Sequence, residues 1–433
     1  MGDGALKVGF IAPYWLPHHG GGEQYVHQTA CSLLEQNVDV VAFTCTVEDL
    51  EKDNGNFPSN RLTRWSPDGK NTYVKDWNNH YAWMNKKSSS TWGGLDADEP
   101  QTHIMRDYDF IDAAVEWAKD EGITVAIINS PWSRVTFHHV KYLYSQLQSL
   151  GIKTGAMHLD LSGMIRRDLI HEYSHHKDWE KAAEIIQDAQ LEVIEEIGEN
   201  LAYFEWDSPM FFKPDFIISC SYWSDRFTDP LQKVPHFVLH PIMRANYWEE
   251  LPQFPQGLDY VNISMINPQY HKGRSIMANL ITSNQEDWSF RVLAGGYGDA
   301  LKEFLPMVEN SWANENGELD IQNYVHDMRE VYRNTDILLF PSRYEGYGMA
   351  AVEPMFCGTA VVASNYPAIV EAVGTDIKTL CPFFSDDEDW EFAIDDVLSQ
   401  LGYWQNKSLE RVKELKERQM AELWGLNYFL GGL

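Results

Sequence analysis

Short apolar runs alternate with amphipathic helical stretches along most of the chain. The runs are nearly continuous in their apolar character, which is typical of strands covered on both faces of a parallel sheet. Twelve of them predict strands, at residues 6–13, 38–44, 124–131, 152–159, 215–221, 235–241, 260–266, 290–296, 319–325, 336–342, 359–365 and 377–381. Because strand and helix follow each other throughout, the pattern predicts an α/β architecture with doubly wound parallel sheets.

The alternation restarts after a proline-rich stretch at residues 250–257, which predicts two domains. We expect a Rossmann-like N-terminal domain over residues 1–245 and a second such domain over 246–405. The remaining stretch, 406–433, carries apolar residues at helical spacing and predicts a long amphipathic helix.

Two stretches interrupt the alternation, and we expect both to be insertions in the N-terminal domain. Residues 50–105 are polar and rich in Trp, Asn and Asp, and a long excursion of this kind is often a functional loop. Its aromatic side chains suit an acceptor surface, with simple loop packing as the alternative. Residues 165–205 are acidic and follow a helical pattern.

Composition narrows the classes of function. Asp and Glu number 64 against 34 Lys and Arg, which gives a formal net charge of −30. A surface this acidic repels phosphate backbones, so nucleic-acid binding is not expected. No apolar run approaches the roughly 18 residues of a membrane helix, so membrane association is not favoured. The five cysteines are scattered without a C-x-x-C pair, which favours reduced thiols and a cytoplasmic location.

Three consecutive glycines, Gly20 to Gly22, follow the first predicted strand. In open parallel sheets ligands bind beyond the carboxyl ends of the strands, so this strand-to-helix loop is a candidate binding segment. The bare backbone amides of Gly20 and Gly21 can face a phosphate or a sugar at the start of a helix, although a tight turn is the alternative. The spacing is not that of the G-x-G-x-x-G dinucleotide motif.

The loop after the strand at 336–342 is the most informative segment. Its glycines and the following helix start are expected to point free amides at an anion. The carboxylates on either side suit hydroxyl groups, because a carboxylate accepts hydrogen bonds from paired hydroxyls. A phosphate flanked by two hydroxyl-rich rings describes a nucleotide sugar, with Glu345 at the transferred sugar and Glu353 at the ribose. The donor-binding residues predicted here are Glu345, Gly346, Tyr347, Gly348, Met349, Ala350 and Glu353.

The spacing of Glu345 and Glu353 looks like the E-x7-E motif of family-4 retaining glycosyltransferases with the GT-B fold. The surrounding residues 335–364 are similar to the pattern of that family, as are GGGEQ after the first strand, DFIISCS at 215–221 and HKG at 271–273. The resemblance implies two Rossmann-like domains facing across a cleft. It places the acceptor on the N-terminal domain and the donor on the C-terminal domain, with the final helix crossing back to the N-terminal domain.

Two further residues complete the predicted site. Lys272 follows the strand at 260–266, and its ammonium is expected to stabilise the charge on a leaving nucleoside diphosphate, with a solvated surface lysine as the alternative. His158 matches a histidine of the family, which implies a hydrogen bond to the donor sugar, although a core histidine is the alternative. The family commonly has Arg about five residues before the lysine, where this chain has Asn267.

The resemblance implies glycosyl transfer with retention, from a UDP- or GDP-type sugar to a hydroxyl of a small-molecule or glycan acceptor. Glu345, His158 and Lys272 are the expected catalytic residues. Attack on the same face, with the departing phosphate taking the acceptor proton, requires no metal or other cofactor. An epimerase of nucleotide sugars, a sugar phosphorylase or synthase, and a non-catalytic sugar-nucleotide-binding module are the alternatives.

Two other patterns carry less weight. His171, Glu172 and His175 spell the H-E-x-x-H zinc-peptidase motif, but the strand pattern does not fit such a peptidase and an exposed polar helix is the simpler interpretation. Asp96 with Asp98, and Asp107 with Asp109, form D-x-D triplets of the metal-binding kind. In a chain with 64 acidic residues, such triplets are expected by chance.

Overall fold

The computed structural model of the chain forms two compact units. Unit 1 comprises residues 1–173, 183–242 and 419–433, and unit 2 comprises 174–182 and 243–418. The residues that the structure describes are 6–12, 21–44, 61–65, 71–76, 108–129, 140–159, 180–181, 183–184, 214–228, 234–243, 261–283, 288–294, 300–323, 325, 327–380 and 386–433.

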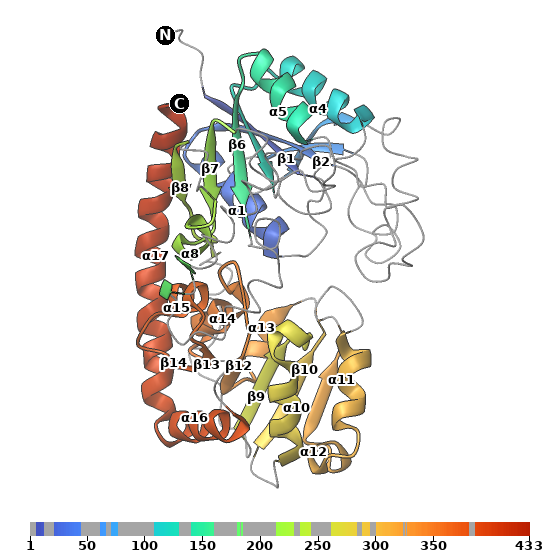
Figure 1. Cartoon of the computed structure of the whole chain (residues 1–433), viewed down its shortest axis with the longest axis vertical. Coiled ribbons are helices and arrows are strands. Elements are labelled where there is room, and N and C mark those ends of the chain that lie inside the picture. Colours follow the sequence, from blue (N-terminus) through green and yellow to red (C-terminus); the bar gives the residue numbers. More distant parts are fainter. Residues whose placement is uncertain are drawn as a thin grey trace. The chain divides into compact units, whose positions relative to one another are not determined.

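Unit 1 is built on one mixed sheet with the strand order β4-β3-β2-β1-β5-β6-β7-β8 (Figure 1). Its strands are β1 (Lys7–Ala12), β2 (Asp39–Thr44), β3 (Arg61–Trp65), β4 (Asn71–Asp76), β5 (Val125–Asn129), β6 (Lys153–His158), β7 (Phe216–Ser219) and β8 (His236–Val238). Its helices are α1 (Gly21–Glu35), α4 (Tyr108–Asp120), α5 (Val140–Ser149) and α8 (Tyr222–Asp225). Strand β3 pairs antiparallel with both β2 and β4, and the other neighbours pair parallel.

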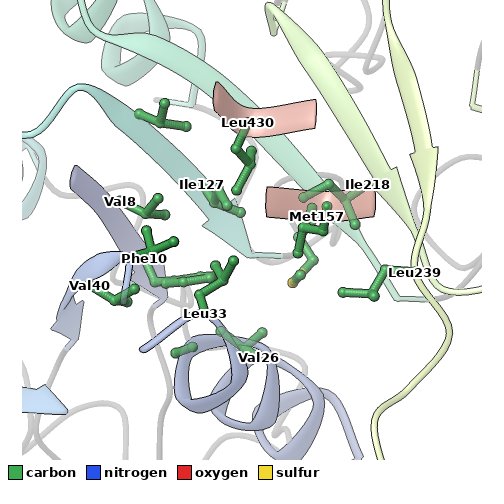
Figure 2. Close-up of a cluster of buried hydrophobic side chains, with 14 of the residues drawn as sticks. Val8, Phe10, Val26, Leu33, Val40, Ile127, Met157, Ile218, Leu239 and Leu430 are labelled. Atoms are coloured by element: carbon green, nitrogen blue, oxygen red, sulfur yellow. The ribbon is translucent and has the colours of Figure 1, made fainter. Parts of the chain in front are cut away.

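Both faces of the sheet are buried at β1, β2, β5, β6 and β7, because successive side chains of each strand point to opposite faces. On β1, Ile11 belongs to a core that includes residues of α4 and α5, whereas Val8 and Phe10 belong to a second core under α1. Figure 2 shows this second core, in which Val26 and Leu33 of α1 pack with residues of the parallel strands. Coverage on both faces explains why the strands read as continuous apolar runs.

Unit 2 contains one fully parallel sheet with the order β11-β10-β9-β12-β13-β14. Its strands are β9 (Val261–Ile266), β10 (Trp288–Leu293), β11 (Leu319–Gln322), β12 (Ile337–Phe340), β13 (Ala360–Ser364) and β14 (Lys378–Leu380). Its α-helices are α10 (Arg274–Ser283), α11 (Ala300–Val308), α12 (Trp312–Glu315), α13 (Met328–Tyr332), α14 (Met349–Val352), α15 (Pro367–Val373) and α16 (Asp387–Ser399), with 3₁₀ helices η4 (Tyr270–Lys272) and η5 (Glu353–Cys357).

The last helix, α17 (Leu401–Gly431), is continuous and belongs to both units (Figure 1). Its residues up to Arg418 are part of unit 2. From Gln419 onward the helix is part of unit 1, where Leu426 and Leu430 enter the core under α1. Glu422 also accepts a hydrogen bond of 2.9 Å from the backbone N–H of His240.

The predicted fold class is confirmed: the chain has two Rossmann-like α/β domains, with a fully parallel sheet in unit 2 and a mainly parallel sheet in unit 1. Each of the twelve predicted strands overlaps an observed strand, and the predicted C-terminal helix is present. The pattern missed β3 and β4, which lie within the stretch 50–105. Among the described residues, no helix has the length and apolar character needed to cross a membrane.

Candidate functional site

The strand order of unit 2 reverses between β9 and β12, which are hydrogen-bonded neighbours although 70 residues separate them. In a doubly wound sheet this reversal opens a crevice at the carboxyl ends of the two strands. Lys272 lies in η4, directly after β9, and Glu345 lies in the loop after β12. The topology therefore brings two of the predicted catalytic residues to the position where such sheets bind ligands.

Lys272 and Glu345 form an ion pair in which the ammonium Nζ donates to Oε1 of the carboxylate. The two side chains are only 20% and 13% exposed, so each charge has lost most of its water and depends on the other. The ammonium also lies 5.9 Å from the ring centroid of Phe340, the last residue of β12. This cation–π contact helps to hold Lys272 over the end of the strand.

A close backbone approach joins the two loops that carry this pair. Gly273, which follows Lys272, has a left-handed φ of 83°, and a Cβ there would lie 2.5 Å from the carbonyl oxygen of Pro341. The N–H of Arg343 donates to the carbonyl of His271 over 2.8 Å. The loops after β9 and β12 are thus fixed to each other, and glycine is required where they touch.

Aromatic stacking reinforces the same contact. The rings of His271 and Tyr344 stack with centroids 5.0 Å apart, and the guanidinium of Arg343 lies 4.5 Å from the ring centroid of Tyr270. These contacts could not be predicted from the sequence, because nothing in the local spacing of the residues shows that the two loops meet.

The glycine loop between the two glutamates leads directly into α14. Gly348 has a φ of 103°, a conformation that favours glycine, and it forms the N-cap of the helix that begins at Met349. Tyr347 is buried, and its burial raises the pKa of its phenol to about 12, although the charge of Arg418 opposes the shift. The predicted contacts from Gly346, Tyr347, Gly348, Met349 and Ala350 to a phosphate stay predictions.

Glu353 lies at the start of η5 and receives a hydrogen bond of 2.9 Å from the hydroxyl of Tyr332 to its Oε2. Burial raises the pKa of this carboxyl to about 7, and the hydrogen bond from Tyr332 opposes that shift only in part. The carboxyl therefore keeps its proton to a higher pH than an exposed glutamate does. Its predicted contact with a ribose stays a prediction, and Tyr332 is a neighbour that the sequence analysis did not select.

Asn267, at the predicted departure from the family pattern, follows β9 with a left-handed φ of 58°. Asn tolerates this conformation better than most residues with a Cβ, which gives a local reason for its presence. Its N–H donates to the carbonyl of Leu293 on the neighbouring strand over 2.8 Å. The side-chain Oδ1 is buried and has no hydrogen-bond partner among the described residues.

In unit 1, the structure places two of the predicted residues at the carboxyl edge of the sheet. Gly21 is the first residue of α1, and His158 is the buried last residue of β6. A Cβ on Gly22 would lie 2.7 Å from Leu159, so the start of α1 approaches the end of β6 closely. Gly20 lies outside the described residues, and the predicted sugar contact of His158 stays a prediction.

A polar cluster centred on Asp225 adjoins His158. Burial of Asp225 favours its neutral form, but hydrogen bonds from His236 and Ser219, with the charges of His236 and His158, hold its pKa below the usual range. The Nδ1 atom of His236 lies 2.9 Å from Oδ1 of Asp225, and the Ser219 hydroxyl donates to the same oxygen over 2.7 Å. This end of the unit 1 sheet therefore carries a fixed negative charge beside a buried imidazole.

The remaining patterns receive no structural support here. The His171, Glu172 and His175 motif lies outside the described residues, as do Asp96, Asp98 and Asp107. Within the described part of the chain, no three His, Cys, Asp or Glu side chains are grouped so that they could hold a metal ion.

Comparison with known proteins finds a family match for the segment that carries the Lys272–Glu345 pair. Residues 269–417 match the model of the Glycosyl transferases group 1 family. The chain therefore carries a glycosyl transferases group 1 domain. A D-inositol 3-phosphate glycosyltransferase of Saccharomonospora viridis is 37% identical over 68 residues, which are 16% of this chain and 16% of that protein. The match thus spans about a sixth of that relative's length.

Solved structures resemble the whole chain, not only the group 1 domain. Sucrose-phosphate synthase from Thermosynechococcus elongatus has a TM-score of 0.64 at 15% identity, covering 98% of this chain and 99% of that one. Anabaena HepE, solved with UDP and glucose, has a TM-score of 0.58 at 13% identity, covering 99% and 100%. At these identities the likeness establishes the fold, which is GT-B.

Proposed function

We propose that the chain is a retaining glycosyltransferase that moves a sugar from a nucleoside-diphosphate sugar to an acceptor hydroxyl. The observation that carries the proposal is the Lys272–Glu345 ion pair at the strand-order reversal of the group 1 domain. In this proposal the Lys272 ammonium meets the diphosphate, and the Glu345 carboxylate accepts hydrogen bonds from sugar hydroxyls. The presence of UDP and glucose in the structure of HepE supports a donor of this class.

Donor binding would separate the ion pair, because each of its two side chains would contact a different part of the ligand. Lys272 would move from Glu345 to the diphosphate, where its charge stabilises the leaving group. Glu345 would then accept hydrogen bonds from hydroxyls of the transferred sugar, for which an ionised carboxylate is a strong acceptor. The observed pairing compensates both partly buried charges.

The other predicted residues have supporting roles in this proposal. The carboxyl group of Glu353 would accept hydrogen bonds from the ribose, and the Gly346–Ala350 backbone would face the phosphates. His158 would donate a hydrogen bond to the donor sugar. The acceptor is a small molecule or a glycan, and the departing phosphate would take the proton of its hydroxyl. The protein's own residues would act through positioning and charge, and the proposal requires no metal.

A panel of UDP-, GDP- and ADP-sugars, incubated with and without candidate acceptors, tests this function by nucleotide release. Release that requires an acceptor is the predicted result. A donor altered without any acceptor would indicate an epimerase, and release with phosphate or a free sugar would indicate a phosphorylase or synthase. Thermal stabilisation without turnover of any donor would indicate a binding module.

Glu345→Gln is the matching variant, because it keeps the shape of the side chain and removes its charge. We expect turnover to fall by roughly 10²–10³-fold, as when a group that stabilises the transition state is removed. The far-ultraviolet circular dichroism of the variant should remain that of the parent protein. Turnover equal to that of the parent protein would contradict the role of Glu345.

A further inference from the structure

The ring of Tyr347 connects the glycine loop to helix α17. Its side chain is 4% exposed, and its hydroxyl accepts a hydrogen bond from Nη2 of Arg418. The guanidinium carbon of the same arginine lies 5.7 Å from the centroid of the tyrosine ring. Arg418 therefore contacts both the polar tip and the face of this one side chain.

A second arginine on the same helix, Arg411, makes similar contacts. Arg411 precedes Arg418 by seven residues, about two helical turns, so both side chains leave the same face of α17. Arg411 donates to the carbonyls of Ala372 (3.1 Å) and Glu371 (2.7 Å), at the C-terminal end of α15. Arg418 also donates to the carbonyl of Glu371, over 3.4 Å, but in addition it reaches Tyr347. Both arginines thus hold α15, whereas Arg418 also holds the glycine loop.

The glycine loop depends on Tyr347 for its position. Between Glu345 and Met349, Tyr347 is the one residue with a side chain, because its neighbours are Gly346 and Gly348. Glycine has the least restricted backbone of all residues, and it has no side chain to pack. The buried ring of Tyr347 is therefore the side chain that fixes the path of the chain here. Moving the ring would move the adjacent Glu345 and the first amides of α14.

We propose that Arg418 is a positioning residue for the nucleotide-sugar donor, acting through Tyr347 on the glycine loop and Glu345. The inference rests on the proposed function, and it adds a residue that lies 65 positions beyond the second glutamate of the loop. Arg418 is also the last residue of unit 2 before α17 continues into unit 1.

The test compares Arg418→Met with Arg411→Met, which removes a guanidinium of the same kind from the same helix face. Amide hydrogen exchange of the ligand-free proteins and calorimetric binding of UDP, GDP and ADP are measured for both. For Arg418→Met we expect faster exchange over residues 345–350 and affinity lowered about fivefold to tenfold for the diphosphate that binds, less than for a charged hydrogen bond made directly to the ligand. For Arg411→Met we expect faster exchange over 370–374 and affinity within about twofold of the parent protein.

Two more variants distinguish a positioning role of Arg418 from a general loss of stability. Arg418→Lys should recover part of the affinity, because it restores a donor near the Tyr347 hydroxyl. Tyr347→Phe should weaken binding as Arg418→Met does, and the double variant should be little worse than either single one, since both remove the same contact.

The outcomes that overturn the inference are distinct from failure of the proposed function. Unchanged exchange over 345–350 in Arg418→Met, or equal affinities of the Arg418→Met and Arg411→Met proteins, would overturn the positioning role alone. If the parent protein bound none of the three diphosphates, the proposed function would fail and the inference with it.

Discussion

Glu353 shows how burial sets the charge of a single candidate ligand group. Burial raises the pKa of its carboxyl from 4.5 to about 7, while the Tyr332 hydroxyl, which donates to the ionised form, limits the rise. Between these two pH values the folded protein holds a proton at Glu353 that the unfolded chain has released. The unfolding free energy contributed by this group is therefore present below about pH 4.5 and is lost as pH rises to 7.

Glu353→Gln should remove this pH dependence. We expect the unfolding free energy of the parent protein to fall relative to the variant between pH 5 and pH 8, by up to about 3 kcal/mol. Urea unfolding at several pH values measures the difference. Tyr332→Phe should extend the fall to higher pH, because it removes the hydrogen bond that favours the ionised carboxylate. Parallel curves for the parent protein and Glu353→Gln would show that the carboxyl titrates at its ordinary pH.

Sequence reasoning found the individual residues that follow strand ends, because parallel strands bring their carboxyl ends to one edge. Lys272 and Glu345 were selected for that reason, and the structure pairs them. The contacts of Tyr332 with Glu353 and of Arg418 with Tyr347 could not be predicted in this way. They join side chains 21 and 71 residues apart, and only the packed fold determines that they meet.

At the scale of elements, the short helix η4 depends on the approach of the two site loops. Gly273 ends it in a left-handed conformation directly against Pro341, where no Cβ can fit. Gly317 has almost the same φ, 81° against 83°, but nothing lies within 4 Å of a Cβ built there. Substituting each glycine in turn therefore separates the free-energy cost of backbone strain from that of the close approach between the loops.

Gly317→Ala should lower the unfolding free energy by about 1–2 kcal/mol, the cost of a left-handed residue with a Cβ. Gly273→Ala should cost more, about 2–4 kcal/mol, because the loops must also separate. It should weaken nucleoside-diphosphate binding as well, since Lys272 would move. Chemical denaturation and calorimetry measure the two effects. Equal losses of stability for both variants would show that the contact with Pro341 contributes nothing.

Elements with continuous apolar runs were predictable, and the antiparallel strands β3 and β4 were not. β3, with the sequence RLTRW, has polar and apolar residues mixed and pairs antiparallel at the side of the sheet. A run of this kind carries neither the continuous signal of a buried parallel strand nor a turn that marks a hairpin. The strand pattern therefore described the parallel part of each sheet and left the antiparallel addition to unit 1 undetected.

At the scale of the whole molecule, the C-terminal end of α17 completes a core of unit 1 that is otherwise formed by the first strands and α1. Leu430 is 2% exposed and packs with residues of the first strands and of α1 (Figure 2). Tyr428, two residues earlier on α17, is 88% exposed. Strand order and this long-range closure depend on how the elements cross over in space, and the local pattern of residues does not encode them.

Leu430→Ala should therefore destabilise unit 1 by about 2–4 kcal/mol, as expected for a leucine removed from a packed core. Tyr428→Ala should change the unfolding free energy by less than about 0.5 kcal/mol. Both are measured by chemical denaturation of the full chain. Similar effects of the two substitutions would show that this part of α17 does not form part of the core.

If Lys272 binds the diphosphate of a nucleotide-sugar donor, calorimetry with Lys272→Ala should detect the loss of that contact. Lys378 is the matched control, because it also forms an ion pair in unit 2, with Asp396 at 2.8 Å, but on the edge strand β14. We predict that Lys272→Ala weakens nucleoside-diphosphate binding by at least about tenfold while Lys378→Ala changes it less than about twofold. Equal affinity of the parent protein and Lys272→Ala would contradict the account.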